Sequence, residues 1–122
     1  METFLSNDEI KKIVIDFTCS FVNISFEELR ENRKSRKREH VIPRQIIFYL
    51  VGKFTGLGTV DIAEIFSKDH ATFIHAKKVI NNLYETDKNF RLRLDIMIKE
   101  ISSILEAKPV IIEETETINF YD

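Results

Sequence analysis

The stretch IFSKDHATFIHAKK, residues 65–78, holds two histidines, one aspartate and three lysines in fourteen residues. Asp69 predicts the start of a helix here, because an aspartate at the N-cap accepts a free backbone N–H group of the first turn. Such a polar front end suits a metal site, an acid–base site or a surface that touches DNA. Helical spacing predicts a buried face and an opposite, exposed face: Phe73, Ala76, Ile80 and Leu83 on the first, and Ala71, His75, Lys78 and Asn82 on the second.

Two capping-box signatures predict where the first two helices begin. Ser6 with Glu9 precedes apolar residues at helical spacing, and Ser25 with Glu28 opens a short helix through Leu29 into a basic run. In such a box the serine accepts a backbone N–H of the first turn, and the glutamate returns a bond to the serine N–H.

The later helices show other start signals. Pro43 suits the first position of a third helix. Gly56 and Gly58 break the pattern and are available for left-handed backbone, and Thr59 can cap a short fourth helix. A sixth helix with regularly spaced apolar residues is expected from about residue 88 to 106.

Together these elements predict an all-α fold of about six helices. The short fourth helix, a tight connection at Ser67 and Lys68, and the fifth helix read as a central helix-turn-helix. After Pro109 the chain is acidic and loses the helical period, which fits a short strand, a docked tail or disorder. We therefore expect a helical domain over residues 1–106 and an acidic, non-helical tail over residues 107–122.

Length and composition restrict the class of protein. A chain of 122 residues fits a single domain, and the lone cysteine, Cys19, allows no internal disulfide. The first residues are acidic where a signal peptide is basic, and no apolar run approaches membrane-spanning length. We expect a cytoplasmic protein without a membrane partner.

The net charge of −2 hides a strong asymmetry. Residues 30–44 hold seven Arg or Lys against two Glu, a local +5, whereas residues 1–29 (two Lys, six acids) and 106–122 (one Lys, five acids) each sum to −4. At physiological salt the field of a charge decays over roughly 8 Å, so the basic patch outweighs the net charge at a DNA surface.

Three motifs carry a resemblance to a known family. They are PRQ at 43–45, IAEIF at 62–66 and KDHATFIHAKKVI at 68–80. Over roughly residues 10–105 the chain resembles the C-terminal DNA-binding domain of the bacterial replication initiator DnaA, which usually reads basic-Asp-His-Thr-Thr-apolar-apolar-His-Ala at the third motif. The resemblance implies a Trp-repressor-like helical fold whose helix-turn-helix binds duplex DNA.

The resemblance also implies roles for individual residues. Asp69, His70 and Ala71 match the tip of the recognition helix, which contacts bases in the major groove, and Arg36 matches an arginine in the adjacent minor groove. An aspartate accepts from a cytosine amino group, a histidine bonds a base or packs on a thymine methyl, and an arginine fits a narrow A·T-rich minor groove. Expected phosphate contacts are Lys34, Lys37, Arg38, Arg44, Gln45, Lys68, Thr72 and Lys78.

Two departures from the family pattern bear on specificity. Ala71 stands where the family has threonine, which leaves only a methyl group for thymine contact. Ser67 and Lys68 replace a longer Gly-Gly-Arg turn, so a different docking angle is expected. The resemblance therefore implies DNA binding, but it does not imply that this chain recognises the family's target sequence.

Two residues of this stretch also have simpler structural roles. Asp69 can act simply as a helix cap, and His75, a turn further along the helix, suits packing or hydrogen bonding.

Other kinds of site have weaker support in the sequence. His70 and His75 are five residues apart, off a common helical face, whereas metal pairs on helices are usually four apart. Cys19 and His40 add no paired ligand spacing. No nucleophile elbow, paired-carboxylate motif or GxxxxGK[ST] loop occurs, and the chain has only three glycines. We expect no metal, no cofactor, no nucleotide site and no catalysis.

Two functions from different classes remain open. The first is a DNA-binding module that regulates transcription or acts at origin-like sites in replication. The second is a protein-interaction module, in which the acidic tail or the acidic face of the first helix binds a protein partner or mimics nucleic acid. The sequence leaves the target DNA and the oligomeric state open.

Overall fold

The computed structural model describes residues 5–107, and these form an all-α fold without strands. Apart from Ala107, which is the last residue of α6, the expected tail lies outside the described residues. None of the described helices is both long and apolar enough to cross a membrane. The elements are α1 (Asn7–Val22), α2 (Phe26–Glu31), α3 (Arg38–Phe54), α4 (Thr59–Ala63), the 3-10 turn η1 (Glu64–Phe66), α5 (His70–Thr86) and α6 (Lys88–Ala107).

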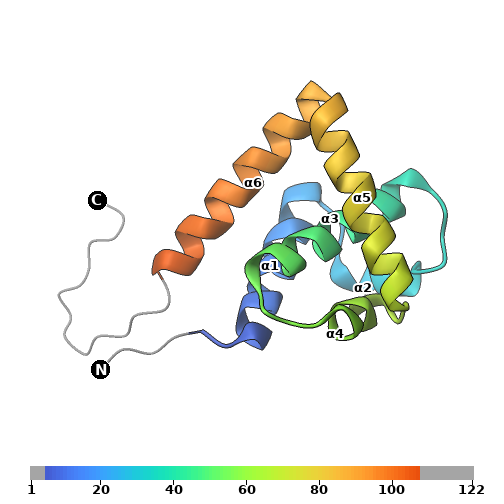
Figure 1. The fold of residues 1–122 in the computed structure, drawn as a ribbon, viewed down its shortest axis with the longest axis horizontal. Helices are drawn as coiled ribbons and strands as arrows, with labels where there is room; N and C mark the ends of the chain where they lie inside the picture. The colour runs from blue at the N-terminus through green and yellow to red at the C-terminus, as the bar shows by residue number, and fades with distance from the viewer. Residues whose placement is uncertain (1–4, 108–122) are drawn as a thin grey trace.

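Helix α3 is the central element. It packs against α1 on one side and α5 on the other, and it also contacts α2 and α4. Figure 1 shows α5 crossing the front of the molecule, then a sharp turn after which α6 runs back along α1. Helices α5 and α6 therefore form a V, in which α3 packs against α5 and α1 packs against both α3 and α6.

An aromatic cluster joins the elements around α3. The Phe48 ring packs edge-on against Phe66, with centroids 5.4 Å apart, and against Phe73, with centroids 6.0 Å apart. Phe26 extends the cluster from α2, 5.6 Å from Phe66. Because buried aromatic rings contribute large apolar area and prefer such tilted geometry, the cluster fixes α2, η1 and α5 to one face of α3.

The first capping box is confirmed and the second is half formed. The Ser6 hydroxyl accepts from the Glu9 N–H at 3.1 Å, and the Glu9 carboxylate accepts from the Ser6 N–H at 2.8 Å. The Ser25 hydroxyl likewise accepts from the Glu28 N–H at 3.0 Å. The Glu28 carboxylate, however, lies 3.7 Å from Nε2 of buried His40, so a tertiary contact replaces the return bond of the box.

The prediction that Pro43 opens the third helix is wrong. Helix α3 begins five residues earlier, at Arg38, and Pro43 lies inside it. The carbonyl of Lys37 accepts the N–H groups of both His40 and Val41 at 2.9 Å, which starts the helix before the proline. The helix continues through Pro43 although a proline donates no hydrogen bond, because His40 and Arg44 tie its first two turns to the preceding loop.

Two details before α4 also differ from expectation. Gly58 is the N-cap, and Thr59 is the first helical residue. Neither Gly56 nor Gly58 has a positive φ. The side-chain oxygen of Asn7 accepts the Gly56 N–H at 3.0 Å, so a contact with α1 holds this loop in place of a left-handed turn.

The two faces of α5 are confirmed. Phe73, Ala76 and Ile80 are buried and Leu83 is half-buried, whereas the four residues predicted for the opposite face are exposed. The last helix spans Lys88–Ala107, within one residue of its predicted end.

Leu29 is the buried side chain of α2, with 0% of its surface exposed. We expect Leu29→Ala to lower the free energy of unfolding by about 2–5 kcal/mol, because the change removes buried methyl groups and leaves a cavity. Urea denaturation followed by circular dichroism measures this, with the exposed Glu27→Ala as the control. A loss below about 0.5 kcal/mol would show that α2 is not anchored as described.

Candidate nucleic-acid interface

A short turn connects the two helices of the helix-turn-helix, as predicted. After η1, Ser67 adopts a left-handed conformation with φ 56° and ψ 44°. The Ser67 N–H donates to the carbonyl of Glu64, and the Lys68 N–H donates to that of Ala63, both at 3.0 Å. The left-handed residue reverses the chain, so that α5 starts beside α4.

Asp69 is the N-cap of α5, as predicted. Its Oδ1 accepts from the Thr72 N–H and from the Thr72 hydroxyl, each at 3.0 Å. The two bonds from Thr72 are the main reason that the pKa of Asp69 lies below its ordinary value. Asp69 is thus an exposed, ionised acceptor at the helix tip. Since Thr72 already donates its hydroxyl proton to Asp69, its predicted phosphate contact requires an exchange of that bond.

His70 and Ala71 are the first two residues of α5, and both are exposed. Backbone N–H groups in a first turn have no helical carbonyl to bind and attract an anion. His75 and Lys78 are exposed further along the same helix. The α5 tip therefore offers a carboxylate, an imidazole, a methyl group and free N–H groups to a partner.

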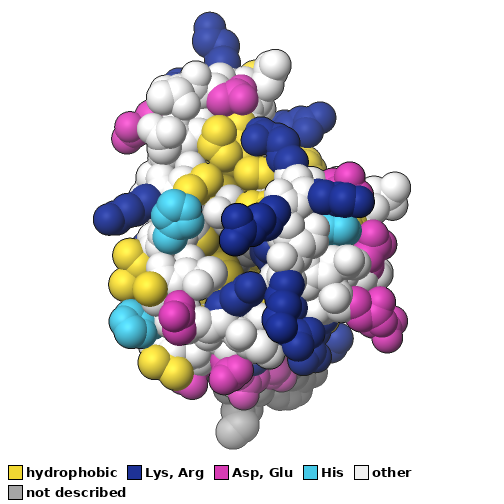
Figure 2. Space-filling model, turned by 90° about the vertical axis from the view of Figure 1, so that its right-hand side faces the viewer, with side chains coloured by type: hydrophobic (Ala, Val, Ile, Leu, Met, Phe, Trp, Pro, Cys, Tyr) yellow, Lys and Arg dark blue, Asp and Glu magenta, His cyan; other side chains and the backbone are white. Residues whose placement is uncertain are grey.

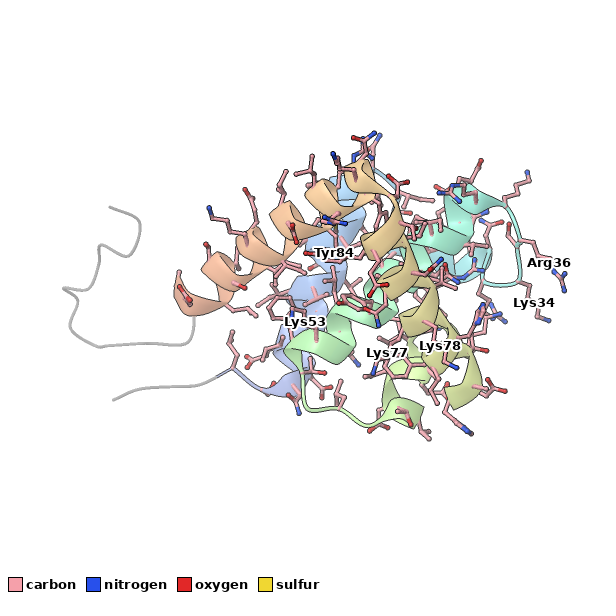
Figure 3. All side chains as sticks on the ribbon, turned by 45° about the horizontal axis from the view of Figure 1, so that its top comes forward. Lys34, Arg36, Lys53, Lys77, Lys78 and Tyr84 are labelled. Carbon is pink, nitrogen blue, oxygen red and sulfur yellow. The ribbon has the colours of Figure 1, made fainter. Side chains whose placement is uncertain are left out.

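The loop between α2 and α3, residues 32–37, holds four cations and no acid, and we call it the basic arm. Figure 3 shows Lys34 and Arg36 projecting from the arm to one side of α5. Lys77 and Lys78 project from α5 itself, and Lys53 stands at the end of α3 on the other side. The remaining cations of the arm are Arg33 and Lys37.

Lys68 is the point where the arm and the α5 tip meet. Burial lowers the pKa of Lys68, and the nearby positive charges of Arg44, Arg33 and Lys34 lower it further. Within residues 5–107, the ion pairs closer than 4.0 Å involve Lys11, Lys12 and His40, not these cations. The cluster is therefore a largely positive surface, and the charge of Asp69 at the α5 tip offsets part of its repulsion.

Figure 2 shows the side of the molecule that carries this cluster. Lysine and arginine side chains spread over its centre, histidines lie toward its left edge and on its right side, and acidic side chains lie mainly around its margins. A negatively charged partner would meet positive charge at the centre of this side.

Three predicted phosphate contacts occupy less open positions. Arg44 is 8% exposed, and its guanidinium donates to the carbonyls of Asn32 and Ser35, so it holds the arm in place. Gln45 is half-buried, and its Oε1 is buried without a hydrogen-bond donor in the described part of the chain. Arg38 is exposed but lines a groove between α1, α3 and α6. The other predicted contact residues are exposed or half-buried on the arm and α5.

Sequence reasoning missed Arg33, which contributes to the field at Lys68, and the exposed lysines Lys53 and Lys77. Arg33 lies inside the basic run, so the charge pattern contained the signal. Lys77 sits over the Phe73 ring, with its Nζ 5.5 Å from the centroid, a contact that depends on tertiary packing.

Among residues 5–107, no group of three or more His, Cys, Asp or Glu side chains is placed to hold a metal ion. Buried Cys19 has its pKa raised to about 11, by burial and then by the charge of Asp16. A thiol in such surroundings is protonated and a poor nucleophile at neutral pH.

Fold and surface together define the class of protein. An all-α domain whose helix-turn-helix presents its second helix beside a cluster of cations has the architecture of helix-turn-helix DNA-binding domains. The family model described as "Bacterial dnaA protein helix-turn-helix" matches residues 10–80. The chain belongs to this family.

Curated relatives agree with this assignment. A chromosomal replication initiator protein DnaA from Bacteroides thetaiotaomicron is 37% identical over 105 residues, which cover 84% of this chain and 22% of that protein. The protein of the same name from Bacteroides fragilis is 39% identical, over 84% of this chain and 21% of its own length. One from a Wolbachia of Brugia malayi is 42% identical over 67% of this chain and 17% of its own. The chain thus spans about a fifth of the length of these relatives.

The lowered pKa of Lys68 has a consequence for stability. The folded protein holds the charged form of Lys68 less well than the unfolded chain does, so this charge costs stability at neutral pH. The cost begins to fall as the pH rises through the lowered pKa of the folded state, and it is gone above the ordinary pKa of the unfolded chain. We expect Lys68→Met, which keeps an apolar stem, to stabilise the free protein by up to about 0.5 kcal/mol and raise its Tm by about 2–4 °C. Thermal unfolding at low salt measures the shift, and Lys99→Met on α6 is the control. A lower Tm for Lys68→Met would contradict the mutual repulsion of the cluster.

Proposed function

We propose that this chain is a cytoplasmic module that binds double-stranded DNA in a sequence-specific way. The tip of α5 enters the major groove, and the basic arm reaches the adjacent minor groove. The observation that carries the proposal is the cluster of cations around Lys68, which brings the arm close to the α5 tip. Within residues 5–107 these cations form no ion pair closer than 4.0 Å, and the charge of Asp69 offsets only part of their repulsion. A phosphate backbone relieves this repulsion, and the release of its counterions favours binding.

The major-groove contacts are assigned to Asp69, His70 and Ala71. Ionised Asp69 accepts from a cytosine amino group, His70 bonds a base edge or packs on a thymine methyl, and the Ala71 methyl packs on another. The exposure of all three side chains at the start of α5 supports these roles. Lys68, Thr72 and Lys78 then face the neighbouring phosphates.

Arg36 is assigned to the minor groove, and Lys34 and Lys37 are assigned to the phosphates that border it. All three side chains are exposed on the arm. A narrow A·T-rich minor groove has an enhanced negative potential, which attracts an inserted arginine. Arg33 joins this group because it adds to the positive field at Lys68.

The biological role we propose is regulation of replication initiation, with transcription as the other process that such binding can serve. The matched relatives are named chromosomal replication initiators, which favours replication. Neither a catalytic step nor a bound nucleotide is assigned to the described residues.

The test is a titration of the protein into random and A·T-rich duplexes at several salt concentrations. For about five phosphate contacts we expect log K to fall with log salt at a slope of about −4 to −5, since each contributes about −0.9.

Arg36→Ala should reduce the steepness of this salt slope by about 0.9 and weaken the preference for the A·T-rich duplex. His70→Ala should lower discrimination for a selected site by about 1–3 kcal/mol.

Arg93→Ala is the matched control, because Arg93 is an exposed arginine of α6 that lines the groove on α1 and α3. It should bind DNA like the unmodified chain. If neither duplex is bound even at low salt, the proposal fails and the positive surface must serve a protein partner instead. Equal losses in the Arg36 and Arg93 variants would show only a general effect of charge.

A further inference from the structure

Two buried polar side chains on α3 reach back to the basic arm. His40 and Arg44 are one helical turn apart, and they are 6% and 8% exposed. Buried polar groups cost free energy unless they are hydrogen-bonded. The groups to which the side chains of His40 and Arg44 bind therefore indicate their structural role.

Arg44 forms hydrogen bonds with the arm at two points. Its Nη1 donates to the carbonyl of Asn32 and its Nη2 to the carbonyl of Ser35, both at 2.9 Å. The Asn32 carbonyl also accepts from the Ser35 N–H at 2.9 Å, so the two acceptors belong to one turn. The planar guanidinium is a rigid fork, and bridging both carbonyls fixes the shape of the turn that carries Arg33 and Lys34.

His40 holds the other end of the arm. Its Nδ1 lies 2.8 Å from the Ser35 hydroxyl, and its Nε2 lies 3.7 Å from the Glu28 carboxylate. Whether Nδ1 accepts from the Ser35 hydroxyl or donates to it depends on the imidazole tautomer, and the contact joins the two side chains in either case. The same hydroxyl oxygen accepts from the Lys37 N–H at 3.1 Å. A chain of contacts thus runs from α2 through α3 to the residues on either side of Arg36.

The same helix also supports α5. Phe48, one turn after Arg44, packs against Phe73 of α5 and Phe66 of η1. The positive charge of Arg44 is also felt at Lys68 beside the α5 tip. Helix α3 therefore holds the arm by hydrogen bonds and the recognition helix by apolar packing.

We propose that Arg44 and His40 are positioning residues that set a fixed register between the basic arm and the tip of α5. This inference rests on the proposed function. Because the arm and the tip are held on one helix, the minor-groove and major-groove elements of the target site have one allowed spacing. Arg44 acts through the arm carbonyls and not through a phosphate.

The experiment compares a selected duplex with versions that carry one base pair more or less between the two elements. One base pair moves them apart by about 3.4 Å and rotates them by about 35°. We expect the unmodified chain to lose about tenfold or more in affinity on either change, similar to the loss for a mismatched base pair. Arg44→Lys keeps the charge but cannot bridge two carbonyls, so its loss should fall below about threefold while its salt slope is unchanged.

Ser35→Ala is the second variant, because it removes the hydroxyl that joins His40 to the arm and leaves the buried residues in place. It should also show reduced spacing discrimination, so the test stands even if Arg44→Lys fails to fold. Arg93→Lys is the control and should keep the full loss. The inference is overturned if Arg44→Lys and Ser35→Ala both bind and discriminate spacing like the unmodified chain. If the unmodified chain binds no duplex, the proposed function itself fails.

Discussion

The packing of Phe48 against Phe66 and Phe73 is the contact on which the rest of the interface depends. It fixes η1 and α5 to α3, and the first turns of α3 hold the basic arm. The arm and the α5 tip are separated by about thirty residues in sequence, yet both are held in place by contacts with α3. Buried apolar packing of this kind supplies the free energy that lets an exposed surface carry unfavourable features.

The interface contains two such features. Cations gather around Lys68, where the charge of Asp69 offsets only part of their repulsion, and Ser67 adopts a left-handed backbone without being a glycine. Each costs stability in the free protein. The charge cluster becomes favourable when a phosphate backbone approaches, because the repulsion is then replaced by attraction. The Ser67 turn is what brings α5 into position beside α4.

Local signals in the sequence predicted most of the fold. The Asp69 cap, the two faces of α5 and the Ser6 capping box depend on residues three or four apart, and all three are confirmed. The start of α3 was missed because it depends on tertiary bonds. The environment of His40 and Arg44 overrides the usual preference of Pro43 for a helix start.

The sequence also indicated only part of the candidate site, because the position of a charged side chain depends on tertiary contacts. The charge pattern marked the arm, and the family resemblance marked the α5 tip, but neither could show that Arg44 is buried and turned toward the arm carbonyls. Which arginine in a basic run is exposed depends on packing against α2 and α3, and sequence spacing does not contain that information. The contacts of individual residues with DNA stay predictions.

An NMR titration of the ¹⁵N-labelled chain with a short A·T-rich duplex tests the central claim, that the arm and the α5 tip form one DNA-binding surface. We expect the amide signals of residues 32–37 and 68–72 to shift together from the first additions of DNA, while those of the outer face of α6 stay in place. Shifts confined to α6 or to the groove between α1, α3 and α6, or no shifts at low salt, would contradict it.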